Sequence, residues 1–269
     1  MNGTVIRYPH FKSNFVNPRH VEVWLPSGYS EGKYYPVLYM HDGQNLFFEN
    51  DAYAGITWQI DPVLSNLIQT KKVPSTIVVG IWNDGDRRYA DYLPQRPFTE
   101  LSDREKANIT PYLNGNPVQS DSYLKFLVSE LKPFIDQTYP TLSERAHTKI
   151  MGSSMGGLIS AYAVCEYPDV FSGAGCVSTN WISLPAVMAR YMEEKLPKPQ
   201  HHRFYFDYGT LGLDAFYEPH QMQVDKVMES IGYTQSEDWV TRKFEGADHN
   251  EAAWQERVHI PLEFLLKMN

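Results

Sequence analysis

The chain has 269 residues but only two cysteines, Cys165 and Cys176. Two cysteines cannot form the dense disulfide framework of a small secreted domain. No apolar run reaches the roughly 18 residues that a membrane-spanning helix needs, so the sequence predicts no contact with a membrane. The N-terminal residues lack the basic and apolar regions of a signal peptide. A cytoplasmic location is therefore the simplest expectation, and secretion of a processed form stays open.

Concentrated positive charge is also lacking. The net charge is −8, and the lysines and arginines are scattered along the chain. Nucleic acid is not expected as a partner, because the phosphate backbone requires a concentrated positive surface. Apolar residues make up 42% and charged residues 21%, as in ordinary soluble proteins, so we expect one domain spanning residues 1–269. The 18 tyrosines and 6 tryptophans either fill the core or line a site for a flat or sugar-like ligand.

Short apolar segments alternate with segments of helical periodicity. Continuous apolar runs between turn residues predict strands buried on both faces, and apolar residues at helical spacing predict the helices that connect them. This alternation predicts an α/β fold with a mostly parallel sheet and helices on both faces. The predicted strands are 19–26, 35–42, 75–82, 147–151, 170–179, 202–209 and 239–246, and the predicted helices are 56–72, 121–139, 154–167, 184–196, 218–232 and 251–268.

One long segment interrupts this alternation. Residues 83–119 contain four prolines and many polar residues. Connections of this length in a compact domain are uncommon and are often binding loops or lids. We therefore favour a lid or binding loop here over a surface insertion without function.

The sequence GSSMG at residues 152–156 fits the pattern G-x-S-x-G, in which the central serine is a nucleophile. A predicted strand precedes it and a predicted helix follows it, as the motif requires. Glycines on both sides of Ser154 leave room for close backbone packing at a sharp turn. The Met155 N–H, at the N-terminus of the helix, is placed to donate to a developing oxyanion. A serine that only caps the helix is the alternative.

A serine nucleophile needs a histidine base and a carboxylate that orients it, and in an α/β-hydrolase these follow in the order serine, acid, histidine. His249 lies in a loop between the last predicted strand and the last predicted helix, at the sheet edge where ligand sites gather. His201 and His202 lie at the N-terminal end of a predicted strand, away from that edge, and His259 falls inside the last predicted helix. His249 is therefore the predicted base among the histidines after the motif, which are His201, His202, His220, His249 and His259.

The acid is expected after the strand at residues 202–209. Asp214 lies there, and its rivals are Asp207 within the strand and Glu218 one turn later. Asp248 is adjacent to His249 in sequence and would hardly reach the far nitrogen of its ring. Asp214 is the predicted acid.

A second oxyanion donor is expected in the loop after an earlier strand. The segment YMHDGQNLF at residues 39–47 ends a buried strand in a polar turn with a glycine. A backbone N–H near Gln44 is therefore the predicted donor, with Asp42 and His41 at its border. An ordinary Asp-Gly turn is the alternative.

Five segments occur in a characteristic order: YMHDGQNLF, GITWQID, GSSMGGLIS, YGTLGLD and GADHNEAAW. With them the chain resembles, from about residue 21 to the last helix, the putative esterase family. That family includes feruloyl and acetylxylan esterases, enterochelin esterases, esterase D and the antigen 85 mycolyl transferases. The resemblance implies an α/β-hydrolase fold with a nucleophile, base and acid at Ser154, His249 and Asp214, and an oxyanion hole made by the N–H groups of Gln44 and Met155.

The resemblance also implies substrate contacts. It places Asp42 and Trp58 near the substrate, and the segment RRYADYLP at residues 87–94 beside the acyl or leaving-group pocket. Tyr92 and Trp181 are further candidates for stacking on a sugar or feruloyl ring, although any of these rings can belong to the core. Two departures are Ser153, where relatives often have a different residue, and the long loop at residues 95–119, which leaves the substrate's size open.

These features predict a serine esterase that acts through an acyl-enzyme on an ester of a sugar, phenolic or short acyl group. Neither a metal nor a cofactor is required. An acyltransferase of the same family differs only in the acceptor of the acyl group, and this alternative stays open. A non-catalytic carbohydrate-binding protein with the same fold would lack a member of the triad, and none is missing from the sequence.

Overall fold

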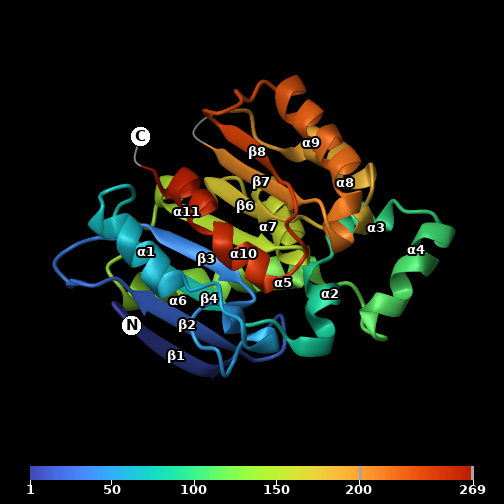
Figure 1. The fold of residues 1–269 in the computed structure, drawn as a ribbon. Helices are drawn as coiled ribbons and strands as arrows, with labels where there is room; N and C mark the ends of the chain where they lie inside the picture. The colour runs from blue at the N-terminus through green and yellow to red at the C-terminus, as the bar shows by residue number, and fades with distance from the viewer. Residues whose placement is uncertain (200–201, 268–269) are drawn as a thin grey trace.

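A single eight-stranded sheet runs through the computed structural model, which describes residues 1–199 and 202–267 (Figure 1). The strand order is β1-β2-β4-β3-β5-β6-β7-β8. β2 pairs antiparallel with both β1 and β4, and all other neighbours are parallel. The predicted mostly parallel sheet is therefore confirmed, with strands β1 Thr4–Phe11, β2 Arg19–Leu25, β3 Val37–His41, β4 Ile77–Ile81, β5 Thr148–Ser153, β6 Gly173–Val177, β7 Arg203–Gly209 and β8 Trp239–Phe244.

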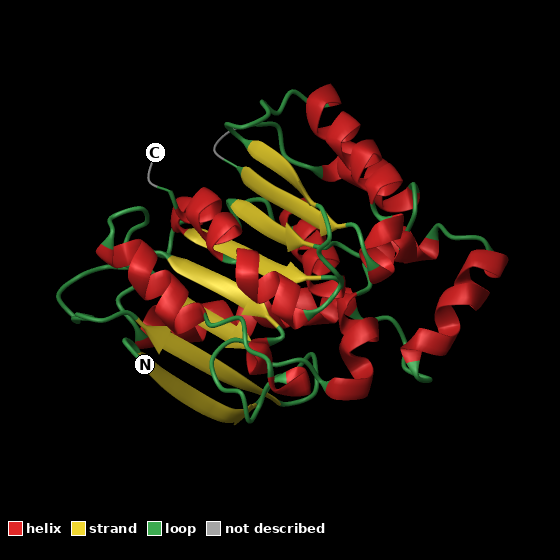
Figure 2. Ribbon diagram, in the orientation of Figure 1, coloured by secondary structure: helices red, strands yellow, loops and turns green. Residues whose placement is uncertain are grey.

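Helices cover both faces of the sheet (Figure 2). One apolar cluster joins one sheet face to α1 (Ile60–Gln69), α10 (Glu251–Arg257) and α11 (His259–Leu266). A second, larger cluster lies on the other face. Its helices are α2 (Arg88–Tyr92), α5 (Ser120–Phe126), α6 (Lys132–Thr138), α7 (Met155–Glu166), α8 (Val187–Lys195) and α9 (Glu218–Ser230). The central strands β3 to β6 are largely buried because both clusters pack against them, which explains the continuous apolar sequences of β3 and β4.

The segment 83–119 differs from the predicted loop because it contains short helices. These are η3 (Gly85–Arg87), α2, α3 (Gln95–Thr99), α4 (Asp103–Ile109) and η4 (Thr110–Leu113). Ser102 and Glu105 form a reciprocal capping box at the start of α4, which satisfies N–H groups that would otherwise lack acceptors. Figure 1 shows α4 at the periphery, away from the sheet.

Three other elements differ from the prediction. β1 is an additional edge strand, and the predicted helix 121–139 consists of α5, a π-helical turn at Leu127–Leu131 and α6. The predicted last helix is divided at Val258 into α10 and α11, and its expected end at Met268 lies outside the described residues.

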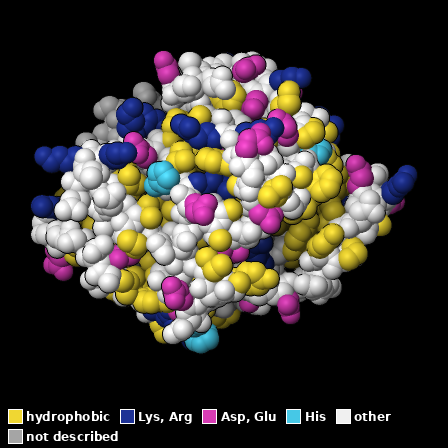
Figure 3. Space-filling model, in the orientation of Figure 1, with side chains coloured by type: hydrophobic (Ala, Val, Ile, Leu, Met, Phe, Trp, Pro, Cys, Tyr) yellow, Lys and Arg dark blue, Asp and Glu magenta, His cyan; other side chains and the backbone are white. Residues whose placement is uncertain are grey.

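The surface carries charges of both signs. Figure 3 shows basic and acidic side chains interspersed over one face, with hydrophobic side chains between them. Within residues 1–199 and 202–267, no helix is both long and apolar enough to cross a bilayer.

Candidate active site

The turn between β5 and α7 holds Ser154 in a conformation that few non-glycine residues adopt. Its φ is 57° and its ψ is −119°, and its N–H donates to the carbonyl of Val177 at 2.8 Å. Such strain persists where the surrounding structure enforces it, often at functional sites. Gly152 is required at this turn because a Cβ there would lie 2.8 Å from the carbonyl carbon of Gly156. The motif therefore produces the sharp strand-to-helix corner that its sequence predicts.

Ser154, His249 and Asp214 form a continuous hydrogen-bonded chain. His249 Nε2 lies 2.9 Å from Ser154 Oγ, and His249 Nδ1 lies 2.5 Å from Asp214 Oδ1. Ser154 follows β5, Asp214 lies in the 3-10 helix η8 (Gly212–Phe216) after β7, and His249 lies in the loop after β8. These three strands are parallel, so their carboxyl ends meet at one edge of the sheet. The His249 side chain is 15% exposed, whereas the Asp214 side chain has no exposed surface.

Three hydrogen bonds stabilise the Asp214 carboxylate in its charged form. Besides His249 at Oδ1, the Ser178 hydroxyl and the Gly209 N–H both donate to Oδ2, each at 2.6 Å. Burial raises the pKa of Asp214, but these donors outweigh burial and hold the pKa below its ordinary value. A charged Asp214 fixes the proton of His249 on Nδ1, which leaves Nε2 to accept the proton of Ser154.

A buried polar network behind Asp214 was not predicted from the sequence. Ser178 Oγ accepts hydrogen bonds from Trp254 Nε1 at 3.0 Å and from Arg257 Nη2 at 2.7 Å. Arg257 also forms an ion pair with Asp207 at 3.2 Å. The one signal in the sequence is the position of Ser178, directly after a buried strand at the edge where ligand sites gather.

The rival acids have other partners. Both carboxylate oxygens of Asp207 bind Arg257, and Oδ1 also accepts the N–H of Ser178. Glu218 pairs with Lys243 at 3.1 Å on the surface. Asp248 Oδ1 accepts the backbone N–H of His249 at 2.7 Å rather than its ring.

The other candidate bases also lie elsewhere. Nε2 of the buried His202 contacts the carbonyl of Pro168 at 3.0 Å, and His259 begins α11. His201 lies outside the described residues.

The predicted oxyanion donors lie in two adjacent turns. Gln44 is in the 3-10 turn η1 (Gly43–Asn45) after β3, and Met155 is the first residue of α7. The first N–H groups of a helix have no acceptor within it, so the Met155 N–H is available to a ligand. Gly43 allows η1 to approach the sheet, because a Cβ there would lie 2.6 Å from the carbonyl carbon of Gly80.

Asp42 anchors this turn, and its role in substrate binding stays a prediction. Its Oδ1 accepts from Asn83 and from Arg88 Nε, and its Oδ2 accepts from Arg88 Nη2, all at 2.7 Å. Asp42 is only 5% exposed and has a left-handed φ of 55°. The Arg88 guanidinium therefore ties segment 83–119 to the turn that holds Gln44.

Three aromatic residues predicted to bind substrate are buried. Tyr92 has no exposed surface, and its hydroxyl accepts the N–H of Asp42 at 3.4 Å. Trp181 is 2% exposed and donates to the buried Gln221 at 2.8 Å. Trp58 is 3% exposed, and its ring packs 6.0 Å from that of Trp254. Contact of these three rings with a substrate stays a prediction.

Another aromatic pair lies within segment 83–119. Tyr89 stacks on Tyr112 with ring centroids 5.4 Å apart, and Tyr112 is 61% exposed. The Tyr89 hydroxyl is 2.6 Å from Ser183 Oγ, which in turn contacts the Met155 sulfur at 3.7 Å. Tyr89 therefore links the exposed Tyr112 to Ser183, the residue that contacts Met155.

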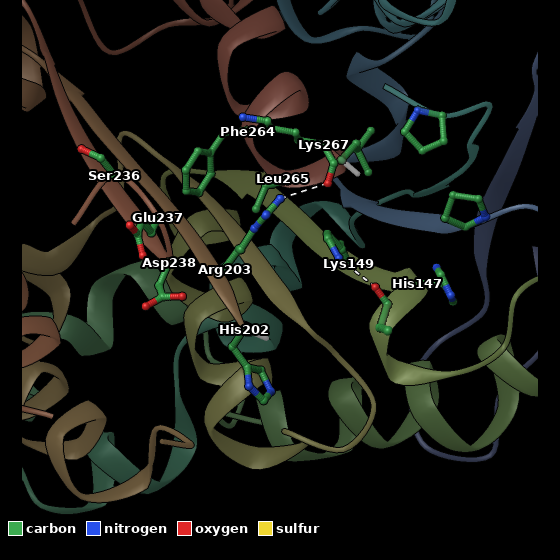
Figure 4. A pocket seen from close by; sticks show the side chains of 14 residues that line it. His147, Lys149, His202, Arg203, Ser236, Glu237, Asp238, Phe264, Leu265 and Lys267 are labelled. Atoms are coloured by element: carbon green, nitrogen blue, oxygen red, sulfur yellow. Dashed lines mark hydrogen bonds between the residues drawn. The ribbon is translucent and has the colours of Figure 1, made fainter. Parts of the chain in front are cut away.

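A large cavity of about 770 Å³ lies at the opposite, amino-terminal edge of the parallel strands (Figure 4). Residues that begin strands or precede them line this cavity, including His147, Lys149, Arg203 and Asp238. None of its lining residues belongs to the chain of Ser154, His249 and Asp214. In the described part of the chain, no three His, Cys, Asp or Glu side chains are grouped as metal ligands.

Comparison with solved structures defines the class of fold. A ferulic acid esterase superposes with a TM-score of 0.70 at 17% sequence identity, and the superposition covers 99% of both chains. The eight-stranded sheet is therefore the α/β-hydrolase fold of known esterases, as the sequence predicted. Residues 13–260 match the model of the family described as "Putative esterase", and the chain belongs to this family.

Two related proteins come from Bacillus subtilis (strain 168), and both are described as uncharacterized. YbbA is 29% identical over 164 residues, which cover 61% of this chain and 57% of YbbA. The match thus spans just over half the length of YbbA. YjcH is 23% identical over 274 residues, which cover 98% of each chain.

Proposed function

We propose that the protein is a serine carboxylic-ester hydrolase that works through an acyl-enzyme. The observation that carries this proposal is the 2.9 Å contact between Ser154 Oγ and His249 Nε2, with Asp214 at 2.5 Å on the other side of the ring. A serine hydroxyl becomes a nucleophile when an adjacent base takes its proton. Membership of the esterase family supports the same reaction class.

The reaction takes two steps. Ser154 Oγ attacks the acyl carbon while Nε2 of His249 accepts the proton, and Asp214 stabilises the resulting imidazolium. The N–H groups of Gln44 and Met155 stabilise the negative charge that develops on the carbonyl oxygen. His249 then gives its proton to the leaving alcohol. A water molecule, deprotonated by His249, attacks the acyl-enzyme and releases the acid.

The proposed substrate is an ester of a sugar, a phenolic acid or a short acyl group. The exposed Tyr112, stacked on Tyr89, offers a flat surface for such a ligand. The fold shared with a ferulic acid esterase is a reason to test phenolic esters first.

The nucleophile is tested by comparing two adjacent serines. Ser154→Ala is expected to lower kcat for p-nitrophenyl acetate by several orders of magnitude, since the triad acts as a unit. Ser153→Ala is the matched control, because Ser153 is also buried but ends β5, and it is expected to keep most of the activity. Hydrolysis by Ser154→Ala at a rate near that of the wild type contradicts the proposal.

The substrate class is tested by a screen over acetylated xylan, feruloyl esters, catecholate siderophore esters and short acyl esters. Release of free acid supports a hydrolase, and transfer of the acyl group to a sugar indicates an acyltransferase. Uniformly weak activity, confined to short acyl esters, contradicts a sugar or phenolic ester as substrate.

A further inference from the structure

Tyr217 is a buried residue next to the candidate active site that has no role in the mechanism above. It follows η8, and its N–H donates to the Asp214 carbonyl at 3.0 Å. Its side chain has no exposed surface, and its hydroxyl makes no hydrogen bond to the described residues. Leaving a buried hydroxyl unpaired costs free energy, so such groups are uncommon in folded proteins.

The neighbours of this hydroxyl are the reacting groups. The Tyr217 ring lies edge-on to the His249 ring, with centroids 5.6 Å apart and planes at 90°. The Ser154 hydroxyl is close enough to interact with the Tyr217 hydroxyl, although the two do not form a hydrogen bond of good geometry. Tyr217 therefore belongs to the same cluster as the nucleophile and the base.

The protonation state of Tyr217 makes it a donor. Burial, and after it the negative charge of Asp214, raise the pKa of Tyr217 well above its ordinary value, and the Ser154 hydroxyl opposes this rise only in part. The phenol thus keeps its proton throughout the pH range in which an esterase operates.

Ser154 Oγ can accept a hydrogen bond from this donor. Its own proton is directed to His249 Nε2, 2.9 Å away, which leaves the lone pairs of Oγ free. Oγ gains negative charge while its proton moves to His249, and again when the acyl-enzyme breaks and Oγ is the leaving group. A hydrogen bond to a charged oxygen is stronger than one to a neutral hydroxyl. A donor at this place therefore favours the transition states over the ground state.

We propose that Tyr217 is a further catalytic residue, whose hydroxyl donates a hydrogen bond to Ser154 Oγ in the transition states of acylation and deacylation. The phenol keeps its proton, and no bond to Tyr217 forms or breaks. This inference rests on the proposed function. The loose contact in the free protein agrees with it, because catalytic hydrogen bonds often tighten only when substrate is bound.

The test is the variant Tyr217→Phe, which removes only the hydroxyl. The matched control is Tyr39→Phe, because Tyr39 Oη is also buried without a hydrogen bond and its ring packs on Phe171, away from the triad. Two rates are measured: hydrolysis of p-nitrophenyl acetate and covalent labelling of Ser154 by a fluorophosphonate, which needs no knowledge of the natural substrate.

Tyr217→Phe is expected to lower kcat and the labelling rate about 10- to 100-fold with little change in KM. Its unfolding midpoint in urea is expected to stay the same or rise, since an unpaired buried hydroxyl is removed. Tyr39→Phe is expected to keep both wild-type rates.

Two outcomes overturn the inference. One is a wild-type labelling rate in Tyr217→Phe, and the other is an equal loss of rate in Tyr39→Phe. A wild-type protein that neither hydrolyses esters nor is labelled at Ser154 overturns the proposed function itself. The two failures are therefore distinguishable.

Discussion

The Ser178 hydroxyl donates a 2.6 Å hydrogen bond to Oδ2 of Asp214, the carboxylate oxygen that His249 does not use. Ser178 also accepts from Trp254 and Arg257, so one hydroxyl links the candidate acid to α10. The orientation of Asp214 therefore depends on a helix that follows His249 in the chain.

Replacing Asp214 tests whether it is the acid that orients His249. Asp214→Asn is expected to lower kcat by about 10³- to 10⁴-fold, because the amide favours the wrong tautomer of the histidine. Glu218→Gln and Asp248→Asn are the controls, since neither side chain contacts the His249 ring, and both are expected to stay within a few-fold of the wild type. Steady-state kinetics with p-nitrophenyl acetate measure this. A comparable loss of kcat in Asp248→Asn would contradict the assignment of Asp214 as the acid.

Removing the Ser178 hydroxyl tests the buried hydrogen-bond network that holds Asp214. Ser178→Ala leaves two buried donors, on Trp254 and Arg257, without this acceptor, and the free energy of unfolding is expected to fall by about 2–3 kcal/mol. The loss in kcat is expected to be smaller than for Asp214→Asn, because Gly209 still holds Oδ2.

The control for Ser178 is Ser160→Ala. The Ser160 hydroxyl is buried but only donates to the Gly156 carbonyl within its own helix, so its loss is expected to cost about 1 kcal/mol or less. Urea unfolding of the two variants measures the difference. Equal midpoints would mean that the donors bound to Ser178 find other acceptors.

The motif residues could be predicted because local sequence determines their placement. A strand, a glycine-flanked serine and a helix form the corner at Ser154, and parallel topology carries Asp214 and His249 to the same edge of the sheet. The supporting network could not be predicted. Ser178 follows β6, Asp207 lies in β7 and Arg257 ends α10, and no pattern within one element signals that they meet.

Aromatic residues could not be assigned to core or site from the sequence for a physical reason. Composition does not distinguish a ring that lines a pocket from one that fills the core, so Tyr92 and Trp181 were assigned to the substrate although both are buried. The strand β1 was missed because Pro9 interrupts its pattern. Proline is tolerated there because β1 is an edge strand, with a bulge between Tyr8 and Phe11.

The short helices in segment 83–119 were missed for a similar reason. Helices of three to seven residues are too short to be stable alone. They depend on contacts such as the Arg88–Asp42 ion pair, which joins residues 46 positions apart.

Adding a methyl group to Gly152 tests the close packing of the turn between β5 and α7. Gly152→Ala places a Cβ 2.8 Å from the backbone of Gly156, and the free energy of unfolding is expected to fall by about 1–3 kcal/mol. The kcat is expected to fall about 100-fold, since a small displacement of Ser154 disrupts its alignment. Gly32→Ala is the control, because its Cβ would lie 3.7 Å from Ser30 Oγ in ordinary contact. Equal activity of both variants would show that the turn between β5 and α7 accommodates a side chain at residue 152.

Lys149, beside the cavity in Figure 4, gives a prediction about pH. Burial is the main cause that lowers its pKa from 10.5 to about 8, with the charge of Arg203 contributing. The unfolded chain therefore binds more protons than the folded chain between about pH 8 and pH 10.5, and stability from this group rises with pH in that window. Below pH 8 the folded state carries the full cost of the buried charge.

Lys149→Met removes this cost but also loses the hydrogen bonds to Ser172 and to the Ala146 carbonyl. The free energy of unfolding of the wild type, relative to Lys149→Met, is expected to rise by about 2 kcal/mol between pH 7 and pH 10. Urea unfolding of both proteins at the two pH values measures this, and other titrating groups cancel in the difference. A difference that stays constant with pH would mean that the Lys149 ammonium is well solvated in the folded protein.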